Sequence, residues 1–351
     1  MNTNKHESGK HGGEFVFHTK ERSMSKLLFA AVLMMAVNVF AAPVFRTVTA
    51  TDEDPAAAGR KAAEALKAAL DGVEPRVVLM ADCFEDKENK VKALAAVTAV
   101  FGRDKVCGGA TYGMFTQAGA LTQDAVGLLA IGGVRVSLAF EEKLGAAGLT
   151  LEKDEAALTA ALRGAGERLA KKLPDAGKGR LMIVVADAHS PKNQLLLDGI
   201  QSVVGKKLPI TGGSVNKNAG QNWVYYQGKA HTDAAVAILL TGDFKLAQAG
   251  RQAKDNDAVI ATAKEGAGEA VTKLGKKPFA ILAFDCAGRK GKLKNVGDEL
   301  AAMQAALGKE VPLFGCYCAG EFGPADAMDV DKTICYGRGW HVMVTALGSS
   351  Q

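Results

Sequence analysis

The sequence predicts an α/β protein with mixed, largely parallel sheets flanked by helices, built from three similar α-β-α-β-β units. The first observation is a set of three apolar runs that each end in aspartate, namely Val77–Asp82, Met182–Asp187 and Ala280–Asp285. Continuous apolar runs of this length are typical of strands buried on both faces. The second observation is that a helical stretch lies on either side of each run, which favours strands connected through helices.

A third observation is that further features recur in the same order after each apolar run. A short segment containing a glycine follows the second helical stretch, and these glycines are Gly108, Gly212 and Gly315. A second aspartate then precedes the closing strand, and these aspartates are Asp124, Asp233 and Asp331. Several features repeated in one order indicate internal duplication.

The units can be delimited by their first helices. In the first unit Asp54 is the expected N-cap and Pro55 the first helical residue. The polar stretch Gly250–Asp257 marks the expected boundary before the last unit. Val134–Phe140 and Trp223–Gln227 are predicted to be additional, antiparallel strands. The predicted organisation is an α/β region at 52–250, with units at 52–133 and 152–242, followed by a third unit at 251–351.

The N-terminal segment has the pattern of a secretory signal peptide at Met24–Ala41. Lys26 supplies the positive charge, and the apolar core Leu27–Val39 is followed by small residues. The core is shorter than the roughly 20 residues that a membrane span needs, so no stable membrane insertion is expected after cleavage. We expect a periplasmic or secreted protein, in which residues 1–23 are a mis-called start or a disordered leader.

Composition and motif spacing argue against several kinds of binding site. The net charge of +5 is mild, and no basic stripe with interleaved aromatic residues indicates nucleic-acid binding. The glycine pairs match neither a GxGxxG nor a P-loop spacing, so no nucleotide cofactor is expected. Cys316-x-Cys318 lacks a second pair at zinc spacing, so no metal is expected. The six cysteines permit disulfides after export, and the sequence leaves their pairing open.

Polar residues follow the three predicted strands at the end where α/β sheets bind ligands. They are Asp82-Cys83, Asp187-Ala188-His189 and Asp285-Cys286. The alternative is that each aspartate caps the next helix, and we favour this role for Asp187. The pairs Gly108-Gly109 and Gly212-Gly213 allow backbone N–H groups to approach an anion, or simply form turns.

The third unit contains two motifs that resemble those of FIST C-terminal domains. They are Cys-x-Gly-Arg, at Cys286–Arg289, and Gly-aromatic-Tyr-x-x-Gly-Glu-x-x-Pro, at Gly315–Pro324. Cys316 and Cys318 depart from the second motif. Upstream, Val77–Asp82, Cys107–Thr111 and Thr211–Ser214 are similar to the FIST N-terminal pattern. FIST domains are regarded as sensory domains, so the resemblance implies a small ligand such as an amino acid and an unknown signalling partner protein.

The motif residues suggest how such a ligand would be held. Arg289 offers a planar fork for a carboxylate, and Glu321 can pair with an ammonium group or with Arg289 itself. Tyr317 is either an aromatic wall of the site or a structural residue. The expected ligand-binding residues are Arg289, Glu321, Tyr317, Cys286, Asp285, Gly320, Gly315, Asp82, Cys83, Gly108, Gly109, Gly212 and Gly213.

Three functions are compatible with these residues. The first is an exported, non-enzymatic sensor of an amino acid or small carboxylate. The second is an enzyme that transfers protons with Cys286 and Cys83, although Asp82 and Asp285 beside these thiols would raise their pKa. The third is an interaction module with a vestigial pocket. We expect the first, with no catalytic residue and no cofactor.

Overall fold

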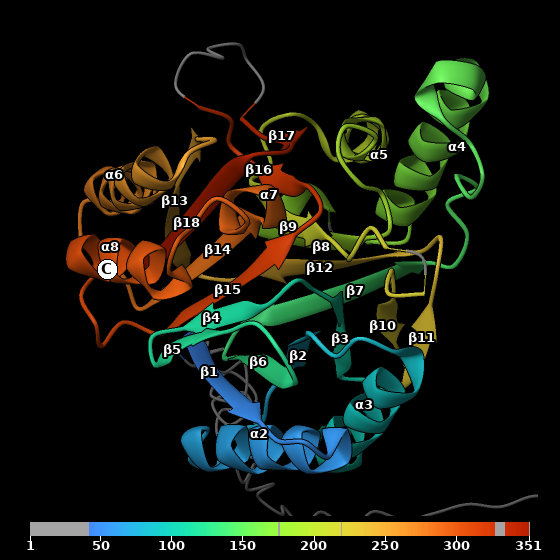
Figure 1. The fold of residues 1–351 in the computed structure, drawn as a ribbon. Helices are drawn as coiled ribbons and strands as arrows, with labels where there is room; N and C mark the ends of the chain where they lie inside the picture. The colour runs from blue at the N-terminus through green and yellow to red at the C-terminus, as the bar shows by residue number, and fades with distance from the viewer. Residues whose placement is uncertain (1–41, 175, 219, 327–333, 351) are drawn as a thin grey trace, which may run out of the picture. The chain divides into compact units, whose positions relative to one another are not determined.

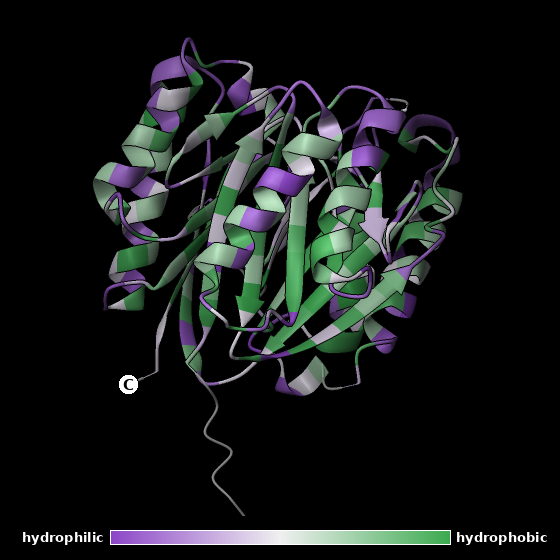
Figure 2. Ribbon diagram, turned by 90° about the horizontal axis from the view of Figure 1, so that it is seen from below, coloured by the Kyte–Doolittle hydropathy of each residue, from purple (hydrophilic) through white to green (hydrophobic). Residues whose placement is uncertain are grey.

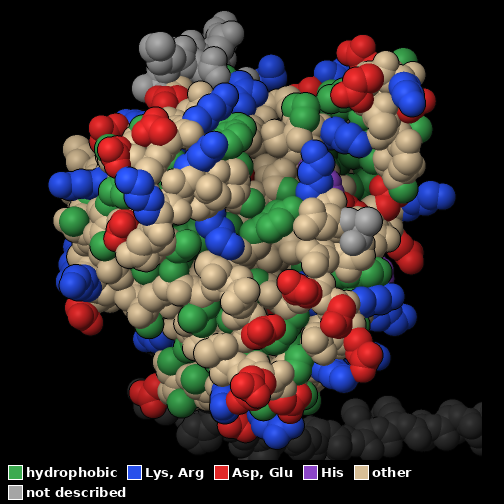
Figure 3. Space-filling view, in the orientation of Figure 1, with side chains coloured by type: hydrophobic (Ala, Val, Ile, Leu, Met, Phe, Trp, Pro, Cys, Tyr) green, Lys and Arg blue, Asp and Glu red, His purple; other side chains and the backbone are tan. Residues whose placement is uncertain are grey.

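The computed structural model describes residues 42–174, 176–218, 220–326 and 334–350. The expected signal peptide, the segment 1–23 and Asp331 lie outside these residues. The described part is an α/β structure with three six-stranded mixed sheets flanked by helices (Figure 1). Within it, no helix is both long and apolar enough to cross a membrane. Basic and acidic side chains are interspersed over the face that Figure 3 shows.

The chain runs three times through the same order of elements. The first repeat contains β1 (Val44–Thr51), α2 (Pro55–Ala69), β2 (Val77–Asp82), α3 (Lys87–Phe101), β3 (Val106–Ala110), β4 (Met114–Thr116), β5 (Gly119–Leu121) and β6 (Ala125–Gly132). The second contains β7 (Arg135–Glu141), α4 (Leu151–Lys171), η1 (Ala176–Lys178), β8 (Leu181–Ala186), α5 (Asn193–Val204), β9 (Ile210–Ser214), β10 (Val224–Tyr226), β11 (Lys229–His231) and β12 (Ala235–Thr241). The third contains β13 (Phe244–Gln252), α6 (Asn256–Leu274), β14 (Ala280–Cys286), α7 (Ala287–Lys290), α8 (Val296–Leu307), β15 (Leu313–Cys318), β16 (Glu321–Gly323), β17 (Tyr336–Arg338) and β18 (His341–Ser349).

Local sequence signals explain several boundaries. Asp54 caps α2 by accepting a hydrogen bond from the N–H of Ala56, and Pro55 occupies the first turn, as predicted. The predicted antiparallel strands near Val134–Phe140 and Trp223–Gln227 are β7 and β10.

Each sheet takes four strands from one repeat and a hairpin from another. The strand orders are β1-β6-β2-β3-β10-β11, β7-β12-β8-β9-β16-β17 and β13-β18-β14-β15-β4-β5. The second repeat therefore completes the sheet of the first, the third completes that of the second, and the first completes that of the third. The three repeats are interlocked by this exchange of hairpins.

The prediction of largely parallel sheets is wrong. Each sheet contains a single parallel pair, formed by β2 with β3, β8 with β9 or β14 with β15, and its other pairs are antiparallel. The apolar runs led to this prediction because strands buried on both faces are typical of parallel sheets. Here both faces are buried for a different reason: the inner face of each sheet packs against the other two sheets, and the outer face packs against helices.

The core has a central part and three peripheral parts. Side chains from the inner faces of all three sheets, including Leu79, Val185 and Phe284, form one central cluster. The outer face of each sheet packs against helices, α2 and α3, α4 and α5, or α6 and α8. In Figure 2 the strands are predominantly hydrophobic, whereas the helices carry hydrophilic residues as well.

The three aspartates of the apolar runs do not occupy equivalent positions. Asp82 pairs in register with Ala110, and Asp285 pairs with Tyr317. The equivalent position in the second sheet is Ala186, which pairs with Ser214, so Asp187 lies one residue later. Because alternate residues of a strand point to opposite faces, this shift gives Asp187 different neighbours from the other two.

Candidate functional site

Arg289, expected to bind a carboxylate ligand, is completely buried among protein groups. Its Nε donates to Asp285 Oδ1 at 2.9 Å, and Nη2 donates to Glu299 Oε1 at 2.8 Å. Nη1 donates to Thr262 Oγ1 at 3.1 Å, and Nη2 also reaches the carbonyl of Val259 at 3.0 Å. The guanidinium thus joins α6, β14 and α8, and neither of its carboxylate partners is Glu321.

Glu321 and Tyr317 belong to the same buried region. Glu321 Oε2 accepts a hydrogen bond from the N–H of His341 at 3.2 Å, whereas Oε1 has no partner among the described residues. Burial, reinforced by the charge of Asp285, raises the pKa of Glu321 well above its ordinary value. Tyr317 donates to Glu299 Oε2 at 3.4 Å. This cluster has the character of a structural core, in which several buried acids lie around one arginine.

The expected binding glycines provide close packing. A Cβ at Gly108 or Gly212, both with φ near 148°, would lie 1.9 Å from a carbonyl oxygen of the neighbouring strand. A Cβ at Gly315 would lie 2.0 Å from the ring of Phe115, which comes from the exchanged hairpin β4–β5. At Gly109, Gly213 and Gly320 as well, protein atoms lie within 3 Å of where a Cβ would be. Gly108 and Gly212 thus allow close pairing with the neighbouring strand of the same repeat, whereas Gly109, Gly213, Gly315 and Gly320 allow close approach between different repeats.

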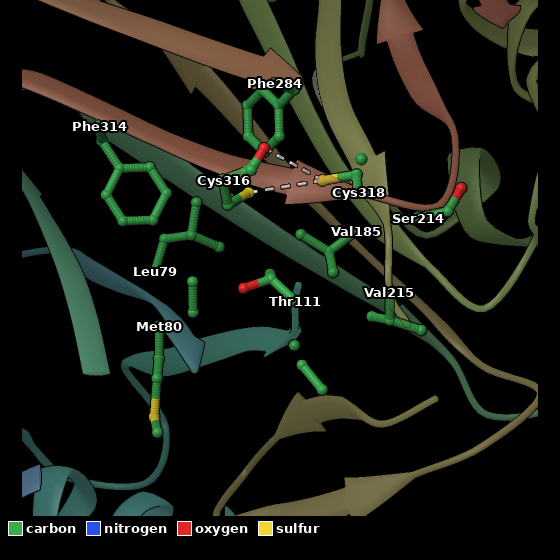
Figure 4. Close-up of a pocket in the computed structure, with 14 residues that line it drawn as sticks. Leu79, Met80, Thr111, Val185, Ser214, Val215, Phe284, Phe314, Cys316 and Cys318 are labelled. Atoms are coloured by element: carbon green, nitrogen blue, oxygen red, sulfur yellow. Dashed lines mark hydrogen bonds between the residues drawn. The ribbon is translucent and has the colours of Figure 1, made fainter. Parts of the chain in front are cut away.

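A small apolar cavity lies where the three sheets meet (Figure 4). Leu79, Val185 and Phe284 line it, one from each sheet, together with the thiols of Cys316 and Cys318, whose sulfur atoms are 3.5 Å apart. The cavity volume is about 10 Å³, which is about the space of one water molecule. It is therefore too small for an amino acid.

A much larger hollow, which we call the rim cleft, lies at the carboxyl ends of β2 and β3. Its volume is about 430 Å³, within the range of small-molecule sites. All three repeats contribute to it: β2, β3 and the residues after them from the first, the loop after β9 from the second, and α7 from the third. The lining residues include Cys83, Glu85, Asp86, Asn89, Thr111, Tyr112, Asp124, Asn216, Asn218, Gln221 and Lys290.

Two polar side chains of the rim cleft, Lys290 and Asn216, can form further ion pairs or hydrogen bonds. Lys290 is half-buried, and its Nζ donates to the carbonyl of Tyr112 at 2.5 Å but forms no ion pair with any described residue. Burial lowers the pKa of this ammonium. Asn216 is 3% exposed, and its Oδ1 has no hydrogen-bond partner in the described structure. A buried, unpaired amide oxygen is costly, so it points to an additional partner in the cleft.

A second hollow of about 390 Å³, the His189 cleft, lies beyond the end of β8. Asp187 Oδ2 accepts from Asn222 Nδ2 and from the N–H of Asp233, both at 2.7 Å. His189 Nε2 lies 3.3 Å from Asp187 Oδ1 and 2.9 Å from the carbonyl of Asn216. Burial lowers the pKa of His189. The prediction that Asp187 caps α5 is wrong, because the N-cap residue Lys192 has no side-chain capping bond and Asp187 holds a loop instead.

The two cysteines considered for catalysis have different surroundings. Cys83 is half-buried and lines the rim cleft, whereas Cys286 is 7% exposed and its Sγ accepts from the N–H of Gly288 at 3.3 Å. Burial raises the pKa of each thiol to about 12. All six cysteines are free. At Cys83, burial outweighs the nearby positive charges of Lys90 and Lys290, so neither thiol has a pKa that favours a thiolate at neutral pH.

Cys83 is therefore expected to resist alkylation despite its place in an open cleft. With a pKa near 12, the thiolate makes up only about one part in ten thousand at pH 8, and the fraction rises with pH. Treating the native protein with iodoacetamide at pH 8 and mapping modified peptides by mass spectrometry checks this. Protein unfolded in urea is the control, and modification of native Cys83 as fast as in urea would contradict the expectation.

Sequence reasoning missed the rim-cleft residues Lys290, Tyr112 and Asn216. Each stands close to a motif that it did identify: Lys290 directly follows Arg289, and Tyr112 and Asn216 each lie three residues beyond a Gly-Gly pair. Their position just after these motifs is the signal in the sequence that marks all three. Of the expected site residues, Cys83 is the one that lines the rim cleft.

Comparison with known proteins identifies two family models along the chain. The FIST N domain matches residues 77–267, and the FIST C domain matches residues 242–324. The search of curated proteins found no match.

Among solved structures, a cyanuric acid hydrolase from A. caulinodans is 12% identical, with a TM-score of 0.45, over 88% of this chain and 100% of that one. A second cyanuric acid hydrolase structure is 12% identical, with a TM-score of 0.44, over 88% and 99%. PurLQS from Thermotoga maritima is 11% identical, with a TM-score of 0.26, over 88% and 72%.

Proposed function

The chain belongs to the FIST family of sensory and signalling domains, whose N-domain model covers more than half of it, and on this premise we propose that it senses a small molecule bound in the rim cleft. The proposed ligand is an amino acid or a small carboxylate. The observation that carries the proposal is the convergence of Lys290 and Asn216, with unused bonding capacity, on one cleft built by three repeats.

The chemistry of the cleft supports an amphoteric ligand. Lys290 offers an ammonium group for a ligand carboxylate, whereas the unpaired Oδ1 of Asn216 can accept a hydrogen bond from a ligand N–H group. The N-terminus of α3, which also borders the cleft, adds a favourable dipole. Glu85 and Asp124 are exposed carboxylates of the same lining and suit the ammonium group of an amino acid. Arg289 supports this site indirectly, because its ion pairs with Asp285 and Glu299 hold α7, which also carries Lys290.

We propose that the mature protein acts after export, with Met24–Ala41 as its signal peptide, and that it transmits ligand binding to a separate signalling protein. Edman or mass-spectrometric analysis of the mature N-terminus tests the export step. A mature chain that retains Met24 would contradict it.

The proposed role is binding without turnover. The thiols of Cys83 and Cys286 have raised pKa values, which disfavour the cysteine-dependent enzyme considered as an alternative. Saturable binding without consumption of the ligand would support a sensor.

Replacing Lys290 by glutamine is expected to weaken ligand binding at least about tenfold, because a hydrogen bond to a charged group contributes about 1.5–3 kcal/mol. Asn216→Ala is expected to act in the same direction. The measurement is a thermal-shift screen of the full chain with amino acids and small carboxylates at millimolar concentration, followed by calorimetric titration of hits.

Lys292→Gln is the matched control. This exposed lysine lies two residues from Lys290 and does not line the rim cleft. Binding that is lost equally in both variants, or that survives Lys290→Gln unchanged, would argue against the rim cleft as the site. If no compound raises the melting temperature of the wild type, the sensory proposal itself fails.

A further inference from the structure

We propose a second binding site, independent of the rim cleft, for an amphiphilic organic anion with an apolar body and a carboxylate or sulfonate group. It lies in a groove of about 650 Å³ between the second and third repeats, which we call the basal groove. The groove is at the amino ends of β8, β9 and β13, the opposite end of the strands from the rim cleft.

The basal groove gathers positive charge from separate elements. Its lining includes Arg180 before β8, Lys207 before β9, Lys245 on β13 and Lys273 at the end of α6. Its described lining residues include no aspartate or glutamate. Four cations around one hollow without a lining carboxylate create a positive potential that favours an anionic ligand.

Most of this charge is not engaged within the protein. Arg180, Lys207 and Lys245 are exposed and make no ion pair or side-chain hydrogen bond with any described residue. Lys273 is the exception, because it pairs with Glu269 at 2.5 Å. Elsewhere, several exposed cations are neutralised by nearby carboxylates, as with Lys92 and Glu88 at 2.8 Å.

Apart from two glycines and Ser350, the rest of the lining is apolar, and this apolar part indicates the other half of the ligand. These residues are Val204, Leu208, Pro209, Phe244, Leu246 and Leu274. Such a surface favours burial of an aromatic or aliphatic body, whereas the surrounding cations favour an acidic head group. A compact inorganic anion would use only the cations, so we assign the groove to an amphiphile.

For two of the four cations, the positive charge has an explanation other than ligand binding. Lys207 and Lys273 lie near the C-termini of α5 and α6, where positive charge offsets the helix dipole. That account does not extend to Lys245, which lies within a strand, or to Arg180, which precedes one. Arg180 and Lys245 are therefore the residues with which to test the proposal.

The probe is 8-anilinonaphthalene-1-sulfonate, titrated by fluorescence against the full-length protein. We expect saturable binding that the double variant Arg180→Gln/Lys245→Gln weakens about tenfold. Binding of the uncharged N-phenyl-1-naphthylamine is expected to change less than twofold. Near-ultraviolet circular dichroism of each variant shows whether its tertiary packing is native.

Two control variants separate the basal groove from general surface charge and from the rim cleft. Lys92→Gln/Lys171→Gln removes two exposed helix cations outside the groove, and Lys290→Gln alters the rim cleft. Both are expected to bind the probe like the wild type. Equal weakening by any control, non-saturable binding, or wild-type affinity in the Arg180→Gln/Lys245→Gln variant would overturn the proposal.

Discussion

Replacing Arg289 by alanine is expected to lower the free energy of unfolding by about 3–5 kcal/mol, because it leaves buried carboxyls without their cation. Asp285 and Glu299 are both fully buried and both pair with this guanidinium. The substitution also removes donors from Thr262 and from the carbonyl of Val259. Urea denaturation followed by circular dichroism measures the change.

Arg163→Ala is the matched control. Its guanidinium also pairs with an aspartate, Asp198, at 2.9 Å, but the pair is exposed and is expected to contribute about 0–1 kcal/mol. A loss of less than about 1 kcal/mol in Arg289→Ala would show that the buried cluster tolerates the missing cation. Any loss of ligand binding in Arg289→Ala is expected to follow from this destabilisation, whereas Lys290→Gln should affect binding with little loss of stability.

Separating the chain after Gly242 is expected to abolish cooperative folding of both pieces. The break falls between β12 and β13, so it divides the second repeat from the third. The first piece would lose β16 and β17 from the sheet of the second repeat, and its own β4–β5 hairpin would have no sheet to join. Exposed strand edges of this kind favour aggregation. Size-exclusion chromatography and urea denaturation of residues 42–242 alone check the outcome.

Co-expression of residues 42–242 with residues 243–351 is the corresponding control. The exchanged hairpins predict that the two pieces assemble into one particle with native-like cooperativity. A monomeric, cooperatively folded 42–242 fragment would contradict the structural interdependence. The FIST N and FIST C regions are thus expected to behave as parts of one folding unit.

Much of the architecture was predictable because it depends on local patterns. The apolar runs identified β2, β8 and β14, the capping residue Asp54 identified the start of α2, and the recurrence of these features indicated repeats. The FIST motifs identified the family. The strand directions were not predictable in this way, because burial of both faces arises from parallel sheets and from stacked antiparallel ones alike.

Fewer residues of the candidate site could be predicted from the sequence. Cys83 was expected in a ligand site and does line the rim cleft, but Arg289 and Tyr317 are enclosed by protein. The sequence motif places the Arg289 guanidinium near the end of a strand. It does not show which carboxylates surround this guanidinium. Asp285 and Glu299 reach it from β14 and α8, and that contact depends on how the helix packs onto the sheet.

The sequence by itself determined the main helices, the central strands, their threefold order and the family, because helix periods, apolar runs and motif spacings are properties of neighbouring residues. The tertiary structure decided which hairpin completes which sheet, and therefore that residues of three repeats share the rim cleft. It also decided that Asp187 lies one residue beyond the register position that Asp82 and Asp285 occupy in their sheets. Because successive residues of a strand point to opposite faces, Asp187 has different neighbours from the other two aspartates. These outcomes depend on contacts between residues far apart in the chain, whose free energies are set by the packing of the whole core.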